Sequence, residues 1–185
     1  MKRLTLATLG MVAAVVAIVA ASSAIDARPS AGSATMAVAT HRQLWQQMTG
    51  YITTAAEELP EADYAYKPTE KVRSFGELVG HVAGAQYMMC AAALGEPPRG
   101  EDEVEKAAKS KAALVAALKA STEYCARAYA QTDEAAGAQT KLFGQDYSRL
   151  FALGLNAVHN GEHYGNIVTY MRMKGMVPPS SRPAR

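Results

Sequence analysis

The sequence predicts an all-α protein, a four-helix bundle with two long connections. Apolar residues recur at steps of three and four residues in four long segments, which is the spacing of a buried helix face. Proline, glycine and a capping motif mark the ends of these segments, and no stretch alternates convincingly as a strand does. Because two connections are long enough to cross the bundle, simple up-and-down order does not follow.

The first expected helix runs over residues 36–59 and stops at Pro60. A long connection of residues 61–73 follows, with tyrosines that we expect to pack across the bundle. The second helix covers residues 74–94 and starts at Ser74-Phe75-Gly76-Glu77, a capping box in which Ser and Glu side chains satisfy free backbone N–H groups.

The third expected helix covers residues 101–131, after a short turn of Gly and Pro residues at 95–98. Residues 132–145 form the second long connection, rich in Ala and Gly. The fourth helix covers residues 147–174, and Gly175 ends it.

The N-terminal residues predict an export signal over residues 1–24. Lys2 and Arg3 precede the uncharged apolar run Leu4–Ala21, and small residues follow as a cleavage site before Ile25. We therefore expect a periplasmic or secreted protein; an uncleaved anchor is the alternative. Residues 25–35 are small and polar and predict a flexible lead-in to a bundle domain of residues 36–180.

The charge pattern argues against a nucleic-acid partner. The formal net charge is +2, and Lys2 and Arg3 account for both positive charges. No basic stripe with interleaved aromatic residues occurs in the remaining chain. Apart from the signal segment nothing predicts membrane contact, so a small-molecule substrate and a second copy of the chain are the partners left open.

Cys90 and Cys125 are the two cysteines. An exported chain favours a disulfide. If a short turn joins antiparallel second and third helices, however, the two residues differ by about 25 Å along the helix axis at 1.5 Å per residue. A disulfide needs Cα atoms within about 7 Å, so we expect two buried free thiols.

The histidines are the most informative residues for function. The chain has four, and His159 and His163 lie one helical turn apart on one face of the fourth expected helix. His81 lies in the middle of the second. Three buried imidazoles can bind one metal ion and leave a position open for water or substrate. Ordinary core histidines are the alternative.

Nearby residues add weaker candidates. Residues 159–163 also spell the inverted zinc-protease motif H-x-x-E-H, but no Asp or Glu follows His163 to supply the carboxylate ligand that such enzymes need. Glu162 is expected to face solvent. His41 is either a fourth ligand or acid–base group, or an ordinary helix-start residue, and Glu77 is explained by capping.

Three segments resemble the DinB/YfiT-like metalloenzymes over roughly residues 38–180. The connection 59–68 is similar to the one after the family's first helix, and residues 74–82 (SFGELVGHV) are similar to the start of its second helix. Residues 159–167 (HNGEHYGNI), with the later Arg172, Gly175 and Pro178-Pro179, resemble its C-terminal motif, although Asn166 stands where the family usually has Gln.

The resemblance implies a four-helix bundle with a three-histidine divalent metal site, zinc or nickel, whose ligands correspond to His81, His159 and His163. It also implies a metal-dependent hydrolase or transferase acting on a small substrate, and some members use low-molecular-weight thiols. A non-catalytic metal-binding bundle and a helical interaction module are the alternatives. No residue stands out as the general base.

Overall fold

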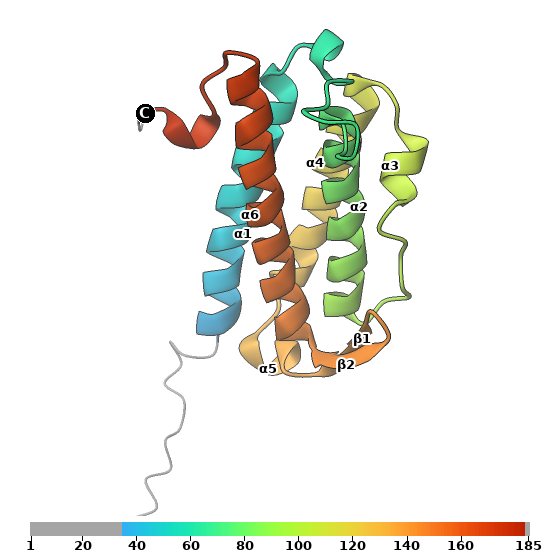
Figure 1. Cartoon of the computed structure of the whole chain (residues 1–185). Coiled ribbons are helices and arrows are strands. Elements are labelled where there is room, and N and C mark those ends of the chain that lie inside the picture. The colour runs from blue at the N-terminus through green and yellow to red at the C-terminus, as the bar shows by residue number, and fades with distance from the viewer. Residues whose placement is uncertain (1–34, 184–185) are drawn as a thin grey trace, which may run out of the picture.

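Four long helices form the bundle in the computed structural model, which describes residues 35–183 (Figure 1). They are α1 (Met36–Glu58), α2 (Phe75–Leu94), α4 (Lys111–Ala128) and α6 (Arg149–Met173). The predicted all-α class and four-helix bundle are thus confirmed. No helix within residues 35–183 combines the length and apolar character that crossing a bilayer requires. The predicted signal segment, residues 1–24, lies outside the described residues, as does nearly all of the lead-in at 25–35.

Shorter elements lie in the connections. The 3-10 helix η1 (Glu61–Asp63) follows α1, the helix α3 (Glu103–Ala107) lies between α2 and α4, and α5 (Asp133–Ala136) follows α4. Strands β1 (Gln139–Leu142) and β2 (Gln145–Ser148) form a hairpin before α6, and η2 (Pro179–Ser181) follows α6.

Helices α2 and α4 run in the same direction, which the sequence interpretation did not foresee. The chain leaves α2 at Gly95 and returns along the length of the bundle through α3 before α4 begins (Figure 1). Ser110 caps α4 by accepting a hydrogen bond from the Ala113 N–H. The predicted single helix over 101–131 is therefore wrong, because residues 108–110 break it and the first part belongs to a returning connection.

The β1–β2 hairpin corrects the expectation of no strand. Gln145 pairs with Leu142, so the turn has only two residues, Phe143 and Gly144. Both have positive φ, 52° and 76°, as a type I′ turn requires. The usual sequence signal for this turn is Asn-Gly or Asp-Gly. Here Phe143 replaces the Asn or Asp, so the sequence does not indicate the turn.

A disulfide joins Cys90 and Cys125, with their Cα atoms 5.3 Å apart. The prediction of two free thiols is wrong because it assumed antiparallel helices joined by a short turn. Since α2 and α4 are parallel, the two residues lie at the same level of the bundle.

A buried amide ties the four long helices together below the predicted metal site. The Trp45 indole N–H of α1 donates to Gln86 Oε1 on α2 at 2.7 Å. Gln86 Nε2 donates to Ser121 Oγ on α4, and Asn160 Nδ2 on α6 donates to Gln86 Oε1. Trp45 is buried. These hydrogen bonds fix the position of α2 along its axis relative to α6.

Candidate metal centre

The structure brings together the three histidines that the sequence singled out. His81 Nε2 lies 3.1 Å from His163 Nε2 and 3.2 Å from His159 Nε2, and the last two nitrogens are 3.0 Å apart. Donors bound to one tetrahedral ion at 2.0–2.1 Å are about 3.3 Å apart. The spacing of the three nitrogens therefore fits a single metal ion.

Local helix geometry positions these rings. His159 and His163 are four residues apart on α6 and project from the same face. His81 comes from the second turn of α2, whose start is fixed by the Ser74 and Glu77 capping box. Helices α2 and α6 pack directly against each other, so one turn of each contributes to the site.

Hydrogen bonding among the rings alone does not explain their arrangement. Each imidazole nitrogen has one in-plane direction, in which it either donates a proton or accepts one. Three Nε2 atoms in mutual contact therefore cannot all be satisfied by one another. A cation among them satisfies all three lone pairs.

Burial keeps the rings in the form that binds metal. Desolvation, aided by the positive charge of Arg73, lowers the pKa of His81 from 6.5 to about 4. Desolvation and the neighbouring histidines lower the pKa of His159 to about 3, and burial also lowers the pKa of His163. All three imidazoles are consequently neutral near pH 7.

The outer ring nitrogens differ in their partners. His163 Nδ1 lies 3.3 Å from the side-chain amide of Asn166, so Asn at this position does contact the ring. Nδ1 of His81 and of His159 is buried and makes no hydrogen bond to the described residues. The nearest carboxylate oxygen to His81 Nδ1 is Glu105 Oε2, at 3.9 Å.

Two carboxylates near the rings were missed by the sequence interpretation. Glu101 Oε1 lies 3.4 Å from His81 Nε2 and 3.9 Å from His159 Nε2. The Arg73 Nε–H donates a bifurcated hydrogen bond to both carboxylate oxygens of Glu105, at 3.1 and 3.2 Å. Both residues lie in the connection between α2 and α4. Helix periodicity does not predict the path of that connection, so it could not place them beside His81.

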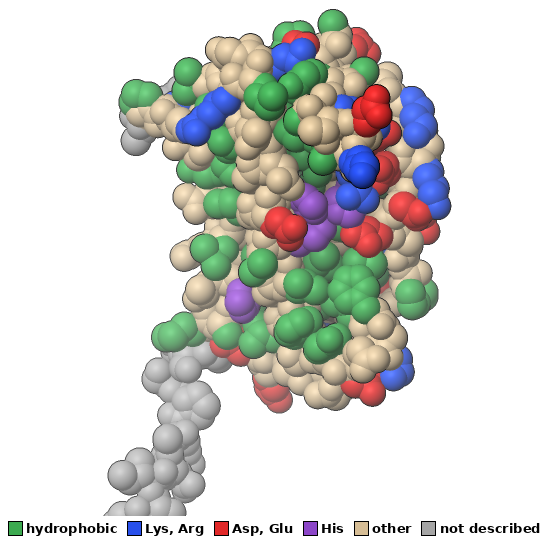
Figure 2. Space-filling view, in the orientation of Figure 1, with side chains coloured by type: hydrophobic (Ala, Val, Ile, Leu, Met, Phe, Trp, Pro, Cys, Tyr) green, Lys and Arg blue, Asp and Glu red, His purple; other side chains and the backbone are tan. Residues whose placement is uncertain are grey.

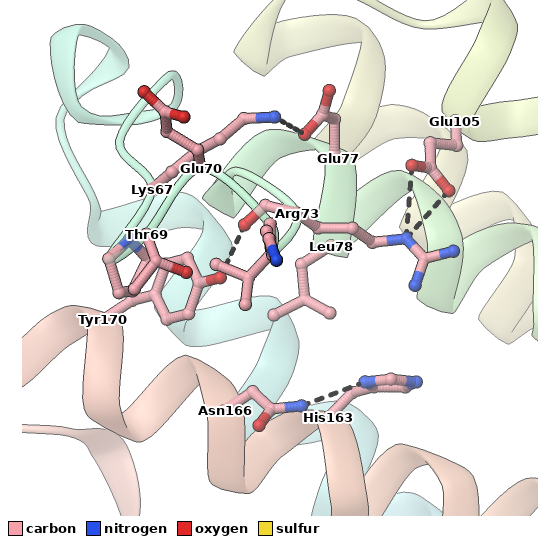
Figure 3. Close-up of a pocket in the computed structure, with 13 residues that line it drawn as sticks. Lys67, Thr69, Glu70, Arg73, Glu77, Leu78, Glu105, His163, Asn166 and Tyr170 are labelled. Carbon is pink, nitrogen blue, oxygen red and sulfur yellow. Dashed lines mark hydrogen bonds and ion pairs between the residues drawn. The ribbon is translucent and has the colours of Figure 1, made fainter.

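A cavity of about 680 Å³ opens beside His163, the one histidine of the three that lines it. Its walls are the loop of residues 67–73, the start of α2, and the His163, Asn166 and Tyr170 side chains of α6 (Figure 3). Tyr170 donates a hydrogen bond to the Arg73 carbonyl and so fastens this loop to α6. Figure 2 shows histidine side chains reaching the surface in the middle of one face, bordered by acidic and basic groups.

The other candidates lie outside the cluster. His41 packs against Gly154 and does not belong to the group of metal-ligating side chains found among the described residues. Glu77 makes the capping box and an ion pair with Lys67 at 2.9 Å, as its helix-start position predicts. Glu162 is exposed.

The described chain is thus a helical bundle in which three histidines from two helices converge beside an open cavity. Its sequence matches the DinB superfamily over residues 43–167, and the chain belongs to that family. No match was found among curated protein sequences.

Solved structures share the fold. A DinB-like protein from Bacillus cereus is 16% identical, with a TM-score of 0.65 over 75% of this chain and 93% of its own. YfiT from Bacillus subtilis, described as a probable metal-dependent hydrolase with an unusual four-helix bundle topology, is 15% identical, with a TM-score of 0.59 over 75% of this chain and 88% of its own. A mycothiol-dependent maleylpyruvate isomerase is 15% identical, with a TM-score of 0.59 over 72% of this chain and 65% of its own.

Proposed function

We propose that His81, His159 and His163 bind one divalent metal ion, zinc or nickel, and that the chain is a metal-dependent hydrolase acting on a small substrate. The observation that carries the proposal is the mutual approach of the three Nε2 atoms to 3.0–3.2 Å. Neutral imidazoles at that spacing have unsatisfied lone pairs directed to one point, and a divalent cation matches them.

The chemistry follows from the donor set. A divalent ion held by neutral imidazoles keeps its positive charge, and such an ion acidifies bound water and polarises carbonyl oxygens. The cavity beside His163 has room for a small molecule, and Asn166 and Tyr170 place polar groups along its wall. The chain's own contribution is to hold the rings neutral, orient His163 through Asn166, and admit substrate from one side.

The proposed export of the chain favours hydrolysis over thiol-dependent transfer. The N-terminal segment has the pattern of a signal peptide, and the Cys90–Cys125 disulfide is typical of an oxidising compartment. We propose a periplasmic or secreted location on these two grounds. The low-molecular-weight thiols that a transferase would use are kept reduced in the cytosol, so a hydrolase acting with water suits an exported chain better.

The test is a hydrolysis screen with a matched pair of variants. The protein loaded with zinc, and separately with nickel, is assayed on small esters, amides and lactones. His163→Ala removes a proposed ligand, whereas His41→Ala removes a histidine outside the cluster. We expect at least a hundredfold loss of rate in the first variant and little change in the second. Equal rates for His163→Ala and the unchanged protein would contradict the proposal.

A further inference from the structure

The carboxylate of Glu101 lies near two of the three nitrogens that would bind the proposed metal ion. Its Oε1 lies 3.4 Å from His81 Nε2 and 3.9 Å from His159 Nε2. Glu105 also lies close to His81, but on the side of Nδ1, the opposite ring nitrogen. Glu101 is therefore placed differently from its acidic neighbour, beside the Nε2 atoms of His81 and His159, although it lies outside the group formed by the three histidines themselves.

Two glycines of α2 make this approach possible. A Cβ atom added to Gly84 would lie 1.9 Å from the Glu101 carbonyl oxygen, and one added to Gly80 would lie 2.9 Å from the Glu105 Cα. The connection between α2 and α4 therefore packs directly against the α2 backbone at Gly80 and Gly84, just before and just after His81 in the sequence. A residue with any side chain at position 84 would push Glu101 away from the rings.

The chain just before Glu101 is also fastened. The Arg99 guanidinium lies over the Tyr87 ring of α2, 3.9 Å from its centroid. The Glu96 carboxylate accepts a hydrogen bond from the Tyr124 hydroxyl of α4 and pairs with Arg127 at 3.2 Å. These contacts set the path of the connection before it reaches the histidines, so the position of the Glu101 backbone is built into the fold.

We propose that Glu101 is a fourth protein ligand of the metal ion, bound through Oε1. This inference rests on the proposed function, because it requires an ion on the three histidines. The 3.4 Å separation from His81 Nε2 is close to the distance of about 3.3 Å between two donors of one tetrahedral ion. The carboxylate also supplies a negative charge, which three neutral imidazoles lack.

Ligation by Glu101 does not obstruct the cavity, so a substrate group could reach the ion as a fifth ligand or in place of the carboxylate. His163 and Asn166 line the cavity, whereas Glu101 is not one of its lining residues. The Glu101 side chain is 39% exposed, so the carboxylate has space to turn away when a substrate group binds. The inferred site therefore combines three imidazoles, two buried and one partly buried, with a displaceable carboxylate.

Metal affinity of the full chain tests this assignment. Dissociation constants for Zn²⁺ and Co²⁺ are measured by competition with a chelating indicator, and the visible spectrum of the Co²⁺ form reports the ligand set. Glu101→Gln should bind both ions about 10- to 100-fold more weakly, the size of effect that even outer partners of a metal site produce. Its Co²⁺ spectrum should change. The matched control, Glu162→Gln, removes the same charge from an exposed residue beside His163 and should bind within about threefold of the unchanged protein.

A second variant keeps the Glu101 carboxylate but shifts its position. Gly84→Ala displaces the Glu101 backbone, so it should weaken metal binding although every ligand is present; circular dichroism checks that the bundle is retained. If the unchanged protein takes up one ion and Glu101→Gln matches it in affinity and spectrum, the Glu101 assignment fails and the three-histidine site stands. Equal weakening in Glu162→Gln would also overturn direct ligation. If the unchanged protein binds no ion, the proposed function fails, and this inference fails with it.

Discussion

Removing the Cys90–Cys125 disulfide should lower the free energy of unfolding by an amount that depends on the length of the loop it closes. The bond closes a chain segment with a sequence separation of 35 residues. The loop-entropy relation then gives a loss of about 13 cal/mol/K for the unfolded chain, or about 3.8 kcal/mol at 25 °C. Both cysteines are fully buried. The Asn156 side-chain amide contacts both sulfur atoms, and it keeps its hydrogen bond to the Tyr129 hydroxyl when both cysteines are changed to Ala.

Thermal unfolding followed by circular dichroism measures the effect. For a domain of this size 1 kcal/mol shifts the melting temperature by about 2–4 °C, so Cys90→Ala/Cys125→Ala should melt roughly 8–15 °C lower. Unchanged protein and variant are compared after chelation, which removes any contribution from bound metal. Alkylation under denaturing conditions without reductant should label neither cysteine of the unchanged protein. Two labelled thiols, or a shift under about 2 °C, would refute the parallel placement of α2 and α4.

Three further outcomes are expected. Chelation should lower the melting temperature by about 5–10 °C, because a ligand at 100 times its Kd stabilises by about 2.7 kcal/mol; no shift would exclude an ion that links α2 to α6. The chelated protein should lose stability as pH falls from about 6.5 toward 4. The unfolded chain binds protons near the ordinary histidine pKa of 6.5, whereas the pKa of folded His81 is about 4 and that of His159 about 3, so protons favour unfolding over this range. Urea titrations at pH 7 and 5 measure this loss, and equal stability at both would contradict the burial of neutral rings. Gln86→Leu should cost about 2–4 kcal/mol, since it leaves the Trp45 indole N–H and the Asn160 amide without their buried acceptor; urea unfolding tests this, and a loss below 1 kcal/mol would contradict it.

The long helices were predictable because local signals determine them. The Ser74 and Glu77 capping box gives the start of α2, and Pro60 follows the end of α1 at Glu58 within two residues. The spacing of His159 and His163 required only that this segment be helical, which its apolar periodicity indicated. His81 was brought to them by the packing of α2 on α6, as the family resemblance implied.

The path between α2 and α4 was not predictable from helix periodicity. Residues 101–107 have a helical pattern whether they continue into α4 or belong to a separate helix that returns along α2. Two signals were present: Ser110 is a favourable N-cap residue, and Gly80 and Gly84 lie one turn apart in α2, where a close backbone approach explains them. Neither signal shows which segment packs against these glycines. The Cys90–Cys125 pairing and the position of Glu101 beside the histidines are therefore seen only in the tertiary structure.

Metal content is the most direct test of the central claim. The purified protein, dialysed with zinc or nickel and then against metal-free buffer, is compared by elemental analysis with the variant in which His81, His159 and His163 are all Ala. We expect about one equivalent of metal in the unchanged protein and none in the variant, which should keep its helical circular dichroism spectrum. One equivalent retained by the variant, or none bound by the unchanged protein, would contradict the three-histidine site.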